Sequence, residues 1–480
     1  MSDDLIRLTA TAAVARLAAG EISPLELVEA AAARIAEVDG AVNALPTLCL
    51  ERARGHARDL MAGRRREAAG ERGWLGGLPV AIKDLIDVEG VRTTYGSPLY
   101  ADHVPTASHP LVRRIERLGG IVIGKSNTPE FGAGGNTFNE VFGRTLNPWN
   151  TALTCGGSTG GGAVALATGE VWLAQGSDHG GSLRGPATLC SVVGIRASPG
   201  RVTRGSPNNL FSPLSVQGPM ARDVTDLALF LDTMAGWCPA DPLTFEAPSV
   251  SFSDAVREAR PPRRVAFTAN YGGALPVDRE TREICTAAAH RLAEAGCVVE
   301  EAFPELGPVE EVFLALRSQA FVVDRELQIA ANPGKFKPDI IWNTRQGLDQ
   351  STSRLAWAER ERAALYRRFA AFFERFDVLV TPGAATPAWD VALRTRDVID
   401  GVATQNYMSG SALTSAITLT SCPAVSVPCG FDRFGRPVGL QVVAPARGEA
   451  QALAAARCVE RIFGLDRLLP IVPRAGVVPQ

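Results

Sequence analysis

Two glycine-rich loops of the sequence each carry a serine. Residues 156–161 read Gly-Gly-Ser-Thr-Gly-Gly, and residues 176–182 read Gly-Ser-Asp-His-Gly-Gly-Ser. Glycines let the backbone come close to a bound molecule and point several N–H groups at one spot, which is how an oxyanion hole is built. A serine at the end of such a turn can attack a carbonyl carbon. Either loop alone could be a plain turn, but Ser158 and Ser182 are only 24 residues apart, and the pair favours acyl-transfer chemistry.

The common serine-hydrolase arrangements do not fit Ser182. In a nucleophile elbow the second residue after the serine is glycine, whereas here it is Arg184. His179 precedes Ser182 by three residues, which is too close along the chain for an ordinary Ser-His-Asp triad. The base that activates a serine must therefore be of another kind.

Lysine is scarce in this chain, with four lysines among 49 basic residues, and codon bias in a GC-rich genome is the simplest reason. Lys83 ends the apolar run Leu-Pro-Val-Ala-Ile at residues 78–82. In a strand, Lys83 and Asp84 point to opposite faces, so Asp84 need not neutralise the lysine. A lysine on a buried face can lose its proton, and its neutral amine can then act as a general base. The alternative is a strand-end lysine whose ammonium group lies in water.

Composition and charge exclude several classes of protein. A net charge of −2 argues against a nucleic-acid partner. We find no run of about 18 apolar residues and no signal peptide, so we expect no membrane partner. Nine cysteines without a CxxC pair indicate reduced thiols and a cytoplasmic location. The five histidines form no zinc motif and no Walker lysine follows the glycines, so we expect no metal and no cofactor.

Alternating strands and helices must position these residues. The pattern predicts an α/β fold, a single large domain with a central mixed, mainly parallel β-sheet flanked by helices on both faces. The proline-rich stretch 239–263 is the best candidate for a linker, but later strands return to the same sheet. Strands are expected at 78–82, 120–124, 171–175, 264–267, 298–301, 378–380, 424–427 and 439–443, and helices at 8–38 (as two), 52–70, 111–118, 161–168, 279–295, 309–331 and 352–376, with mostly loop at 130–162.

Several motifs in the correct order resemble the amidase signature family of serine hydrolases, and the similarity spans most of the chain. The matching pieces are Gly77-Leu-Pro-Val-Ala-Ile-Lys-Asp84, Gly124-Lys-Ser-Asn-Thr-Pro-Glu-Phe131, Gly143-Arg-Thr-Leu-Asn-Pro-Trp149, Gly156-Gly-Ser-Thr-Gly-Gly161, Asp178-His-Gly-Gly-Ser-Leu-Arg184, Cys190-Ser-Val-Val-Gly-Ile-Arg196, Pro423-Ala-Val-Ser-Val-Pro428 and Gly435-Arg-Pro-Val-Gly-Leu-Gln441. The resemblance implies the amidase signature fold over residues 1–480. This domain would comprise an N-terminal helical region (1–70), a signature core (76–201), a variable substrate-side region (202–420), and strands and a helix that return to the core (421–480).

The resemblance also implies a Ser–cis-Ser–Lys triad. Ser182 matches the nucleophile that forms the acyl-enzyme, and Ser158 matches a bridging serine that follows a cis peptide bond. Lys83 matches the base, which takes the proton through that serine. The N–H groups of His179, Gly180, Gly181 and Ser182 match the oxyanion hole.

Other positions receive supporting roles. Where His179 stands, the family often has threonine or a small aliphatic residue, so this ring either lines the leaving-group side or packs beneath the loop. Lys125 is expected to be a structural cation at a strand end. Aromatic residues of the variable region either shape the pocket or form core, namely Phe313, Phe321, Trp342 and Trp357. The expected supporting residues are Thr159, Ser177, Asp178 and Arg184, and the expected substrate-binding residues are Gly132, Ala133 and Cys155.

The function implied by the resemblance is hydrolysis of a small-molecule carboxylic amide without a cofactor. Alternatives are a carbamate, urea-type or ester hydrolase with the same triad, and the glutaminase component of a tRNA-dependent amidotransferase. That component typically has a tyrosine-containing stretch where this chain has Pro199-Gly-Arg-Val-Thr-Arg-Gly-Ser206. A catalytically silent binding protein is a third class. The N-terminal helices could pair two copies of the chain into a homodimer.

Overall fold

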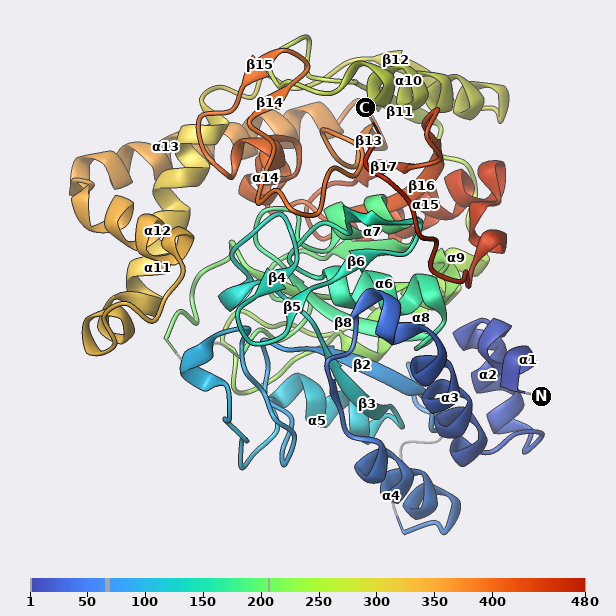
Figure 1. The fold of residues 1–480 in the computed structure, drawn as a ribbon. Helices are drawn as coiled ribbons and strands as arrows, with labels where there is room; N and C mark the ends of the chain where they lie inside the picture. Colours follow the sequence, from blue (N-terminus) through green and yellow to red (C-terminus); the bar gives the residue numbers. More distant parts are fainter. Residues whose placement is uncertain (1, 65–69, 206–207, 480) are drawn as a thin grey trace.

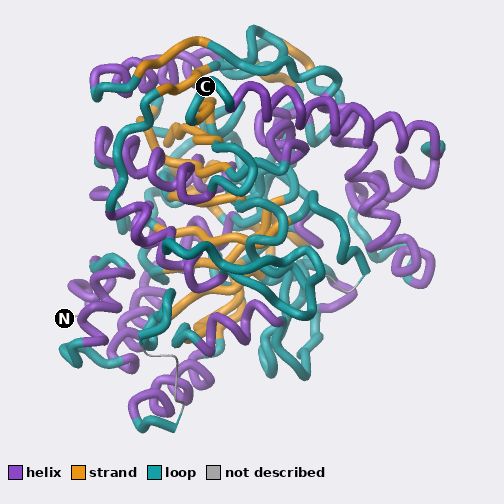
Figure 2. The backbone as a smooth tube through the Cα atoms, turned by 180° about the vertical axis from the view of Figure 1, so that it is seen from behind, coloured by secondary structure: helices purple, strands orange, loops and turns teal. Residues whose placement is uncertain are grey.

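The computed structural model describes residues 2–64, 70–205 and 208–479. Its centre is an 11-stranded sheet that runs through the molecule from the N-terminal helices at one end to β11 and β12 at the other (Figures 1 and 2). The strand order is β1-β3-β2-β8-β10-β9-β16-β17-β13-β11-β12. These strands are β1 (Thr47–Leu48), β2 (Pro79–Lys83), β3 (Ile121–Ser126), β8 (Leu173–Asp178), β9 (Val193–Arg196), β10 (Val216–Ala221), β11 (Arg264–Phe267), β12 (Val298–Glu301), β13 (Val378–Pro382), β16 (Ala424–Phe431) and β17 (Pro437–Val443).

The sheet is mixed, as the sequence predicts, but the expectation that it is mainly parallel is wrong. Parallel pairings join β3 to β2, β2 to β8, β13 to β11 and β11 to β12. The other pairings between described strands of this sheet are antiparallel. The physical reason is connection length, because β16 and β17 are joined by a short turn that can only make a hairpin. Parallel pairs near both ends therefore enclose an antiparallel middle.

Helices cover both faces of this sheet (Figure 2). The two helices expected within residues 8–38 are α2 and α3, and α3 begins with a capping box between Ser23 and Glu26. The α-helices of the described residues all cover the sheet or pack on one another. They are α1 (Ser2–Arg7), α2 (Ala10–Ala18), α3 (Pro24–Val42), α4 (Leu50–Met61), α5 (Pro110–Arg117), α6 (Gly160–Thr168), α7 (Arg184–Cys190), α8 (Val224–Met234), α9 (Phe252–Arg257), α10 (Arg279–Glu294), α11 (Val309–Ala331), α12 (Pro338–Asp349), α13 (Thr352–Phe373), α14 (Ala412–Thr420) and α15 (Glu449–Phe463).

Several expected segments differ from the structure. The strand expected at 171–175 is β8, which runs to Asp178, and the sheet strands β9 and β10 were not expected. The helix expected over 52–70 ends at Met61 as α4, and residues 65–69 lie outside the described residues. The loop at 130–162 contains four short strands, and the candidate linker at 239–263 contains α9. The short strands are β4 (Phe138–Asn139), β5 (Gly143–Arg144), β6 (Leu146–Asn147) and β7 (Asn150–Thr154). A further short pair, β14 (Val398–Ile399) and β15 (Val402–Ala403), lies in the variable region.

Helix α6 is buried along its whole length and carries the first serine loop into the core. Its first turn is glycine because the backbone passes close to other segments. A Cβ atom on Gly161 would lie 2.4 Å from the backbone N of Asn127 and 2.6 Å from the carbonyl O of Ala44. The first turn of α6 is therefore held against the residue that follows β3, beside the strand β2 that ends in Lys83.

Helices α11, α12 and α13 form a projecting group on one side of the molecule, drawn in yellow and orange in Figure 1. Helix α11 packs on α12, α13 and α14. These elements belong to the variable region, whereas β16 and β17 from the C-terminal part lie between β9 and β13 in the sheet. Within the described ranges, no helix is both long and apolar enough to cross a membrane.

Lys125 and Asp84 form a buried ion pair between β3 and the residue that follows β2. Lys125 is fully buried, and its Nζ lies 3.0 Å from Asp84 Oδ1, 2.9 Å from the carbonyl O of Ile86 and 2.8 Å from Thr93 Oγ1. Asp84 in turn accepts hydrogen bonds from the N–H and hydroxyl groups of Thr94. This is the structural cation that the sequence predicts at position 125.

Replacing Lys125 by methionine should lower the free energy of unfolding by about 3–5 kcal/mol, because it leaves the Asp84 carboxylate buried without its counter-charge. The urea midpoint, followed by tryptophan fluorescence, measures the effect. The double variant Lys125→Met/Asp84→Asn is the control and should recover part of the loss, since it buries no unpaired charge. A single variant as stable as the parent would contradict the structural role.

Candidate active site

Lys83 is the last residue of β2 and is fully buried. Its Nζ lies 2.7 Å from Ser158 Oγ, 2.9 Å from Thr159 Oγ1 and 3.1 Å from Ser177 Oγ. The amine therefore faces three hydroxyl groups, two from the loop before α6 and one from the neighbouring strand β8. The structure brings together Lys83, Ser158, Thr159 and Ser177, all of which the sequence singled out.

The surroundings of Lys83 favour its neutral form. Burial lowers the pKa of Lys83 to about 7, although the negative charge of Asp178 opposes the shift. Among the described residues, no carboxylate lies within ion-pair distance of Lys83. The hydrogen-bond partners of its Nζ are hydroxyl groups. Lys125, by contrast, bonds directly to Asp84. The two buried lysines thus have different chemistry, one paired and one free to exchange a proton with a hydroxyl.

Ser158 is buried at the start of the turn that leads into α6. The peptide bond between Gly157 and Ser158 is cis, as the resemblance implies. Close packing explains the preceding glycine, since a Cβ on Gly157 would lie 2.6 Å from the carbonyl O of Gly134. Gly132 also leaves room beside the serine, because a Cβ there would lie 3.3 Å from Ser158 Oγ.

Ser182 lies in the turn between β8 and α7, next to the loop that carries Ser158. The N–H of Thr159 donates to the carbonyl O of Ser182 at 3.1 Å, which ties the two serine loops together. Ser158, Ser177 and Ser182 all line one cavity. A hydroxyl pathway therefore leads from the buried amine, through Ser158, to the space in front of Ser182.

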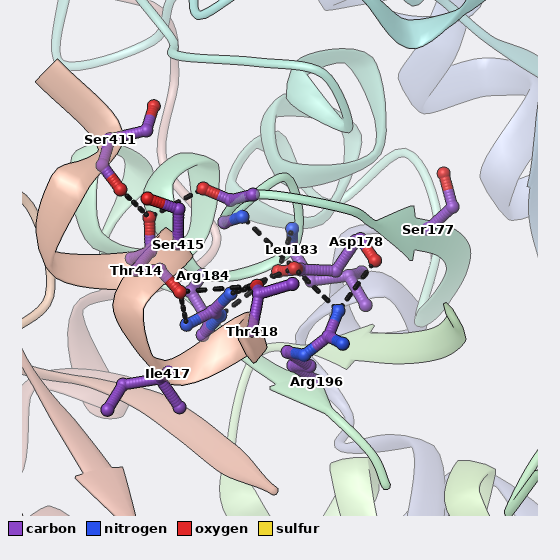
Figure 3. A network of polar contacts seen from close by, with 12 residues as sticks. Ser177, Asp178, Leu183, Arg184, Arg196, Ser411, Thr414, Ser415, Ile417 and Thr418 are labelled. Atoms are coloured by element: carbon purple, nitrogen blue, oxygen red, sulfur yellow. Dashed lines mark hydrogen bonds and ion pairs between the residues drawn. The ribbon is translucent and has the colours of Figure 1, made fainter. Parts of the chain in front are cut away.

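Asp178 organises the loop that carries Ser182 (Figure 3). Its carboxylate accepts hydrogen bonds from the N–H groups of Gly181 at 3.0 Å and Leu183 at 3.1 Å. It also pairs with Arg184 at 2.9 Å and Arg196 at 3.2 Å. Burial alone would raise the pKa of Asp178, but the two guanidinium groups and the backbone bonds outweigh it and hold this pKa far below its ordinary value. Asp178 therefore stays ionised and keeps the turn in one conformation.

The hydrogen bonds of this loop change the expected oxyanion hole. The peptide group between Gly180 and Gly181 is held at both ends, since Thr414 Oγ1 donates to the carbonyl O of Gly180 at 2.6 Å and the N–H of Gly181 donates to Asp178. Gly181 is thus not a free donor, because the carboxylate already takes its hydrogen. The N–H groups of His179, Gly180 and Ser182 have no acceptor among the described residues and remain available.

His179 both lines the cavity and packs on a core residue. Its ring meets Phe313 edge-on, with ring centres 5.7 Å apart, and its Nε2 is buried without a hydrogen-bond partner among the described residues. Burial lowers the pKa of His179 well below its ordinary value, and the nearby charge of Arg317 acts in the same direction. The ring is therefore neutral near pH 7. The ring packs on Phe313 and also borders the cavity that contains Ser158, so each of the two expected placements holds in part.

Two cavities meet at Ser182. The smaller has a volume of about 80 Å³ and is walled largely by glycine backbone, including Gly180 and Gly181. The larger has a volume of about 650 Å³ and contains Ser158 and His179. Ser182, Gly132 and Arg317 border both spaces. The larger cavity also has an aromatic wall made of Tyr95, Tyr100, Phe131 and Phe321.

Two of the expected substrate-binding residues lie elsewhere. Ala133 is fully buried in a small apolar cluster with Phe336 and Ile340, and it borders neither cavity. Cys155 is fully buried behind the serine loop, where burial raises the pKa of its thiol to about 12. Its side chain packs toward α6, so the thiol does not reach the substrate space. Gly132 is the member of the expected set that does border both cavities.

Sequence reasoning missed three residues of the site, Thr414, Arg317 and Tyr407, and assigned no role to Arg196. The first three lie in the variable region, where no motif is recognisable. One signal was present for Arg317, because Phe313, Arg317 and Phe321 are four residues apart and share one face of α11. Phe321 lines the larger cavity and so shapes the pocket, which is one of the two roles expected for the aromatic residues of the variable region.

Comparisons with known proteins agree with this geometry. Residues 26–453 match the family model described as Amidase. The chain is 33% identical to an acylamidase of Rhodococcus erythropolis, with 95% of each chain covered. The chain belongs to the amidase signature family. It is also 35% identical to the A component of the glutamyl-tRNA(Gln) amidotransferase of Moorella thermoacetica, over 94% of this chain and 95% of that protein.

The solved structure of a bacterial aryl acylamidase of the amidase signature family superposes with a TM-score of 0.87 at 25% identity. The alignment covers 97% of this chain and 99% of that one. The expected fold of this amidase is therefore confirmed, as is the expectation of an enzyme that cleaves amides.

The rate of amide hydrolysis should depend on pH through Lys83. If the neutral amine is the base, kcat/KM rises about tenfold per pH unit below pH 7 and levels off above it, because only the unprotonated fraction can accept a proton. Initial rates between pH 5 and 9 measure this. Enzyme incubated at each pH and assayed at pH 8 serves as the control for inactivation. A flat profile from pH 6 to 9 would exclude this assignment.

Proposed function

We propose that this amidase hydrolyses a small-molecule carboxylic amide through an acyl-enzyme on Ser182. The observation that carries the proposal is the buried amine of Lys83, 2.7 Å from Ser158 Oγ, at the wall of a cavity that Ser158 and Ser182 share. A neutral amine accepts a proton from one hydroxyl, and that hydroxyl can in turn accept a proton from another. Lys83 is the base and Ser158 the relay in this scheme.

The first step is attack of Ser182 Oγ on the amide carbonyl carbon. As the C–O bond forms, the Ser182 proton moves to Ser158 Oγ and the Ser158 proton moves to Lys83 Nζ. The carbonyl oxygen becomes an oxyanion, which the free N–H groups of Gly180 and Ser182 can bind, with that of His179 as a third donor. Asp178 and Thr414 fix the peptide between these groups, so the donors are in place before the charge develops.

The second step breaks the C–N bond, and the position of Ser158 indicates which cavity holds the leaving amine and which holds the acyl part. Ser158 gives its proton to the leaving nitrogen and regains one from Lys83. Because Ser158 borders the larger cavity and not the smaller, the leaving amine faces the larger cavity and the acyl part occupies the smaller. Water then attacks the ester of Ser182 with the same relay, releasing the acid and restoring the enzyme.

The size of the larger cavity favours a substantial leaving group. A volume of about 650 Å³ lies in the range of ligand pockets, and its wall contains four aromatic rings. A glutaminase releases only ammonia, so this cavity favours a free-standing hydrolase over an amidotransferase component. The stretch Pro199–Ser206, which bears on the same question, ends in Ser206 outside the described residues.

Ester, carbamate and urea-type substrates share the carbonyl that the triad attacks, and a panel of such compounds separates them from amides.

The nine cysteines are all unpaired, as in a reducing compartment, and we propose a cytoplasmic location. Neither point alters the chemistry assigned to Ser182.

Two substitutions test the catalytic roles. Ser182→Ala should abolish hydrolysis, and Lys83→Arg should lower kcat at least about 100-fold, because a guanidinium keeps its proton and cannot serve as a base. Steady-state rates with an anilide measure both effects. Lys335→Arg, the same change at an exposed lysine, is the matched control and should retain full activity.

Covalent labelling separates an enzyme from a silent binding protein. A fluorophosphonate should modify Ser182 of the parent, as located by peptide mass spectrometry, and should not modify the Ser182→Ala variant. Full activity of Lys83→Arg would rule out the base, and an unlabelled parent would rule out the nucleophile.

A further inference from the structure

Arg317 is a buried cation without a counter-ion. It lies on α11 with 4% of its surface exposed, and no carboxylate of the described residues is within ion-pair distance. Its Nε donates to Asn343 Oδ1 at 3.1 Å, and its Nη2 donates to the hydroxyl of Tyr407 at 2.8 Å. The Nη1 group has no acceptor among the described residues. Burying a charge in this way is costly unless something pairs with it.

Other buried arginines have partners for their donors, either a carboxylate or, in Arg222, the carbonyl O atoms of Ile6 and Leu8. Arg184 binds Asp178 through two nitrogen atoms, and Arg201 binds Glu449. Arg317 differs because its unused donors face open space, since it borders both cavities that meet at Ser182. The empty half of its guanidinium group therefore points to where substrate binds.

Tyr407 supplies a second donor at the same place. Its hydroxyl oxygen accepts hydrogen bonds from Arg317 and from Asn343 Nδ2 at 2.6 Å. The hydroxyl hydrogen is then left without an acceptor among the described residues. Tyr407 borders the smaller cavity and not the larger, whereas Arg317 borders both, so the smaller cavity is the one that both residues reach.

The two donors are held rigidly. Asn343 is fully buried and also donates to the carbonyl O of Asp339 at 2.6 Å. The guanidinium of Arg317 lies 4.7 Å from the ring centre of Phe321, and the ring of Tyr407 packs edge-on against Trp342 at 5.8 Å. A site fixed in this way loses little conformational freedom on binding an anion.

We propose that Arg317 and Tyr407 bind a carboxylate on the acyl part of the substrate. This inference rests on the proposed function, which places the acyl part in the smaller cavity. Guanidinium and phenol donors together suit the two oxygens of a carboxylate. The smaller cavity, at about 80 Å³ against about 650 Å³ for the larger one, favours a short acyl chain. The substrate class is therefore the monoamide of a short dicarboxylic acid, with a bulky amine in the larger cavity.

A matched pair of anilides tests the inference. N-(4-nitrophenyl)succinamic acid carries the terminal carboxylate, and N-(4-nitrophenyl)butanamide has the same chain length without the charge. The parent should hydrolyse the acid with a kcat/KM at least about tenfold higher, mainly through a lower KM. Arg317→Gln should remove this preference while it still cleaves the neutral anilide, and Tyr407→Phe should reduce the preference in part.

The control for charge loss is Arg354→Gln, at a half-buried arginine on α13 that pairs with Glu311 of α11 and borders neither cavity, and it should keep the preference. A second pair, 4-acetamidobenzoate and acetanilide, places the carboxylate on the amine instead. If Arg317→Gln changes selectivity only in this second pair, the placement in the acyl cavity is wrong. Equal losses for charged and neutral anilides in Arg317→Gln would overturn the inference.

A binding measurement covers the case of slow turnover. Succinate is the acid product of the charged anilide and should slow fluorophosphonate labelling of Ser182 in the parent but not in Arg317→Gln. Succinate that protects neither protein would overturn the inference. If Ser182 is labelled and the neutral anilide is hydrolysed but the carboxylate has no effect, only this inference is refuted. If neither labelling nor hydrolysis occurs, the proposed function itself is refuted.

Discussion

The burial of one amine among hydroxyl groups is the constraint on which the rest of the site depends. Lys83 can act as a base only if water and carboxylates are kept away from its Nζ, and the structure achieves this with Ser158, Thr159 and Ser177. The cost is a lysine that the fold must keep buried and neutral. The all-buried helix α6, with its glycine turn, allows the first serine loop to come this close.

A second constraint fixes the donors for the developing negative charge. Asp178 combines two arginines and two backbone N–H groups in one buried network (Figure 3). Its charge also opposes the loss of the proton from Lys83, so one carboxylate influences both halves of the site. The orientation of the oxyanion donors and the basicity of the amine are therefore linked through a residue that never touches the substrate.

The sequence predicted the parts of this site that depend on local pattern. Lys83, Ser158 and Ser182 could be found because glycine loops and an apolar strand are visible in a single sequence. Strands β2 and β3 were placed to within two residues, but β8 was expected to end at residue 175 and its neighbour β10 was not expected. The occupied N–H of Gly181 could not be foreseen, since it depends on where a side chain three residues away turns. Arg317 and Tyr407 are 90 residues apart and meet only through tertiary packing. The antiparallel middle of the sheet likewise depends on strand order, which periodicity does not report.

The pairing of β2 with β8 has a consequence for how this enzyme can change. Ile82 lies opposite Gln175, and Lys83 follows directly, with its amine beside the hydroxyl of Ser177. A slip of one residue in this pairing would turn the amine to the other face of the sheet, toward the side of Asp84 and Lys125. Insertions or deletions within these two strands should therefore be far less tolerated than changes in loops that do not set this register. New substrate ranges are therefore expected to arise in the segments that line the two cavities, α11 among them, while the strands β2 and β8 keep their length.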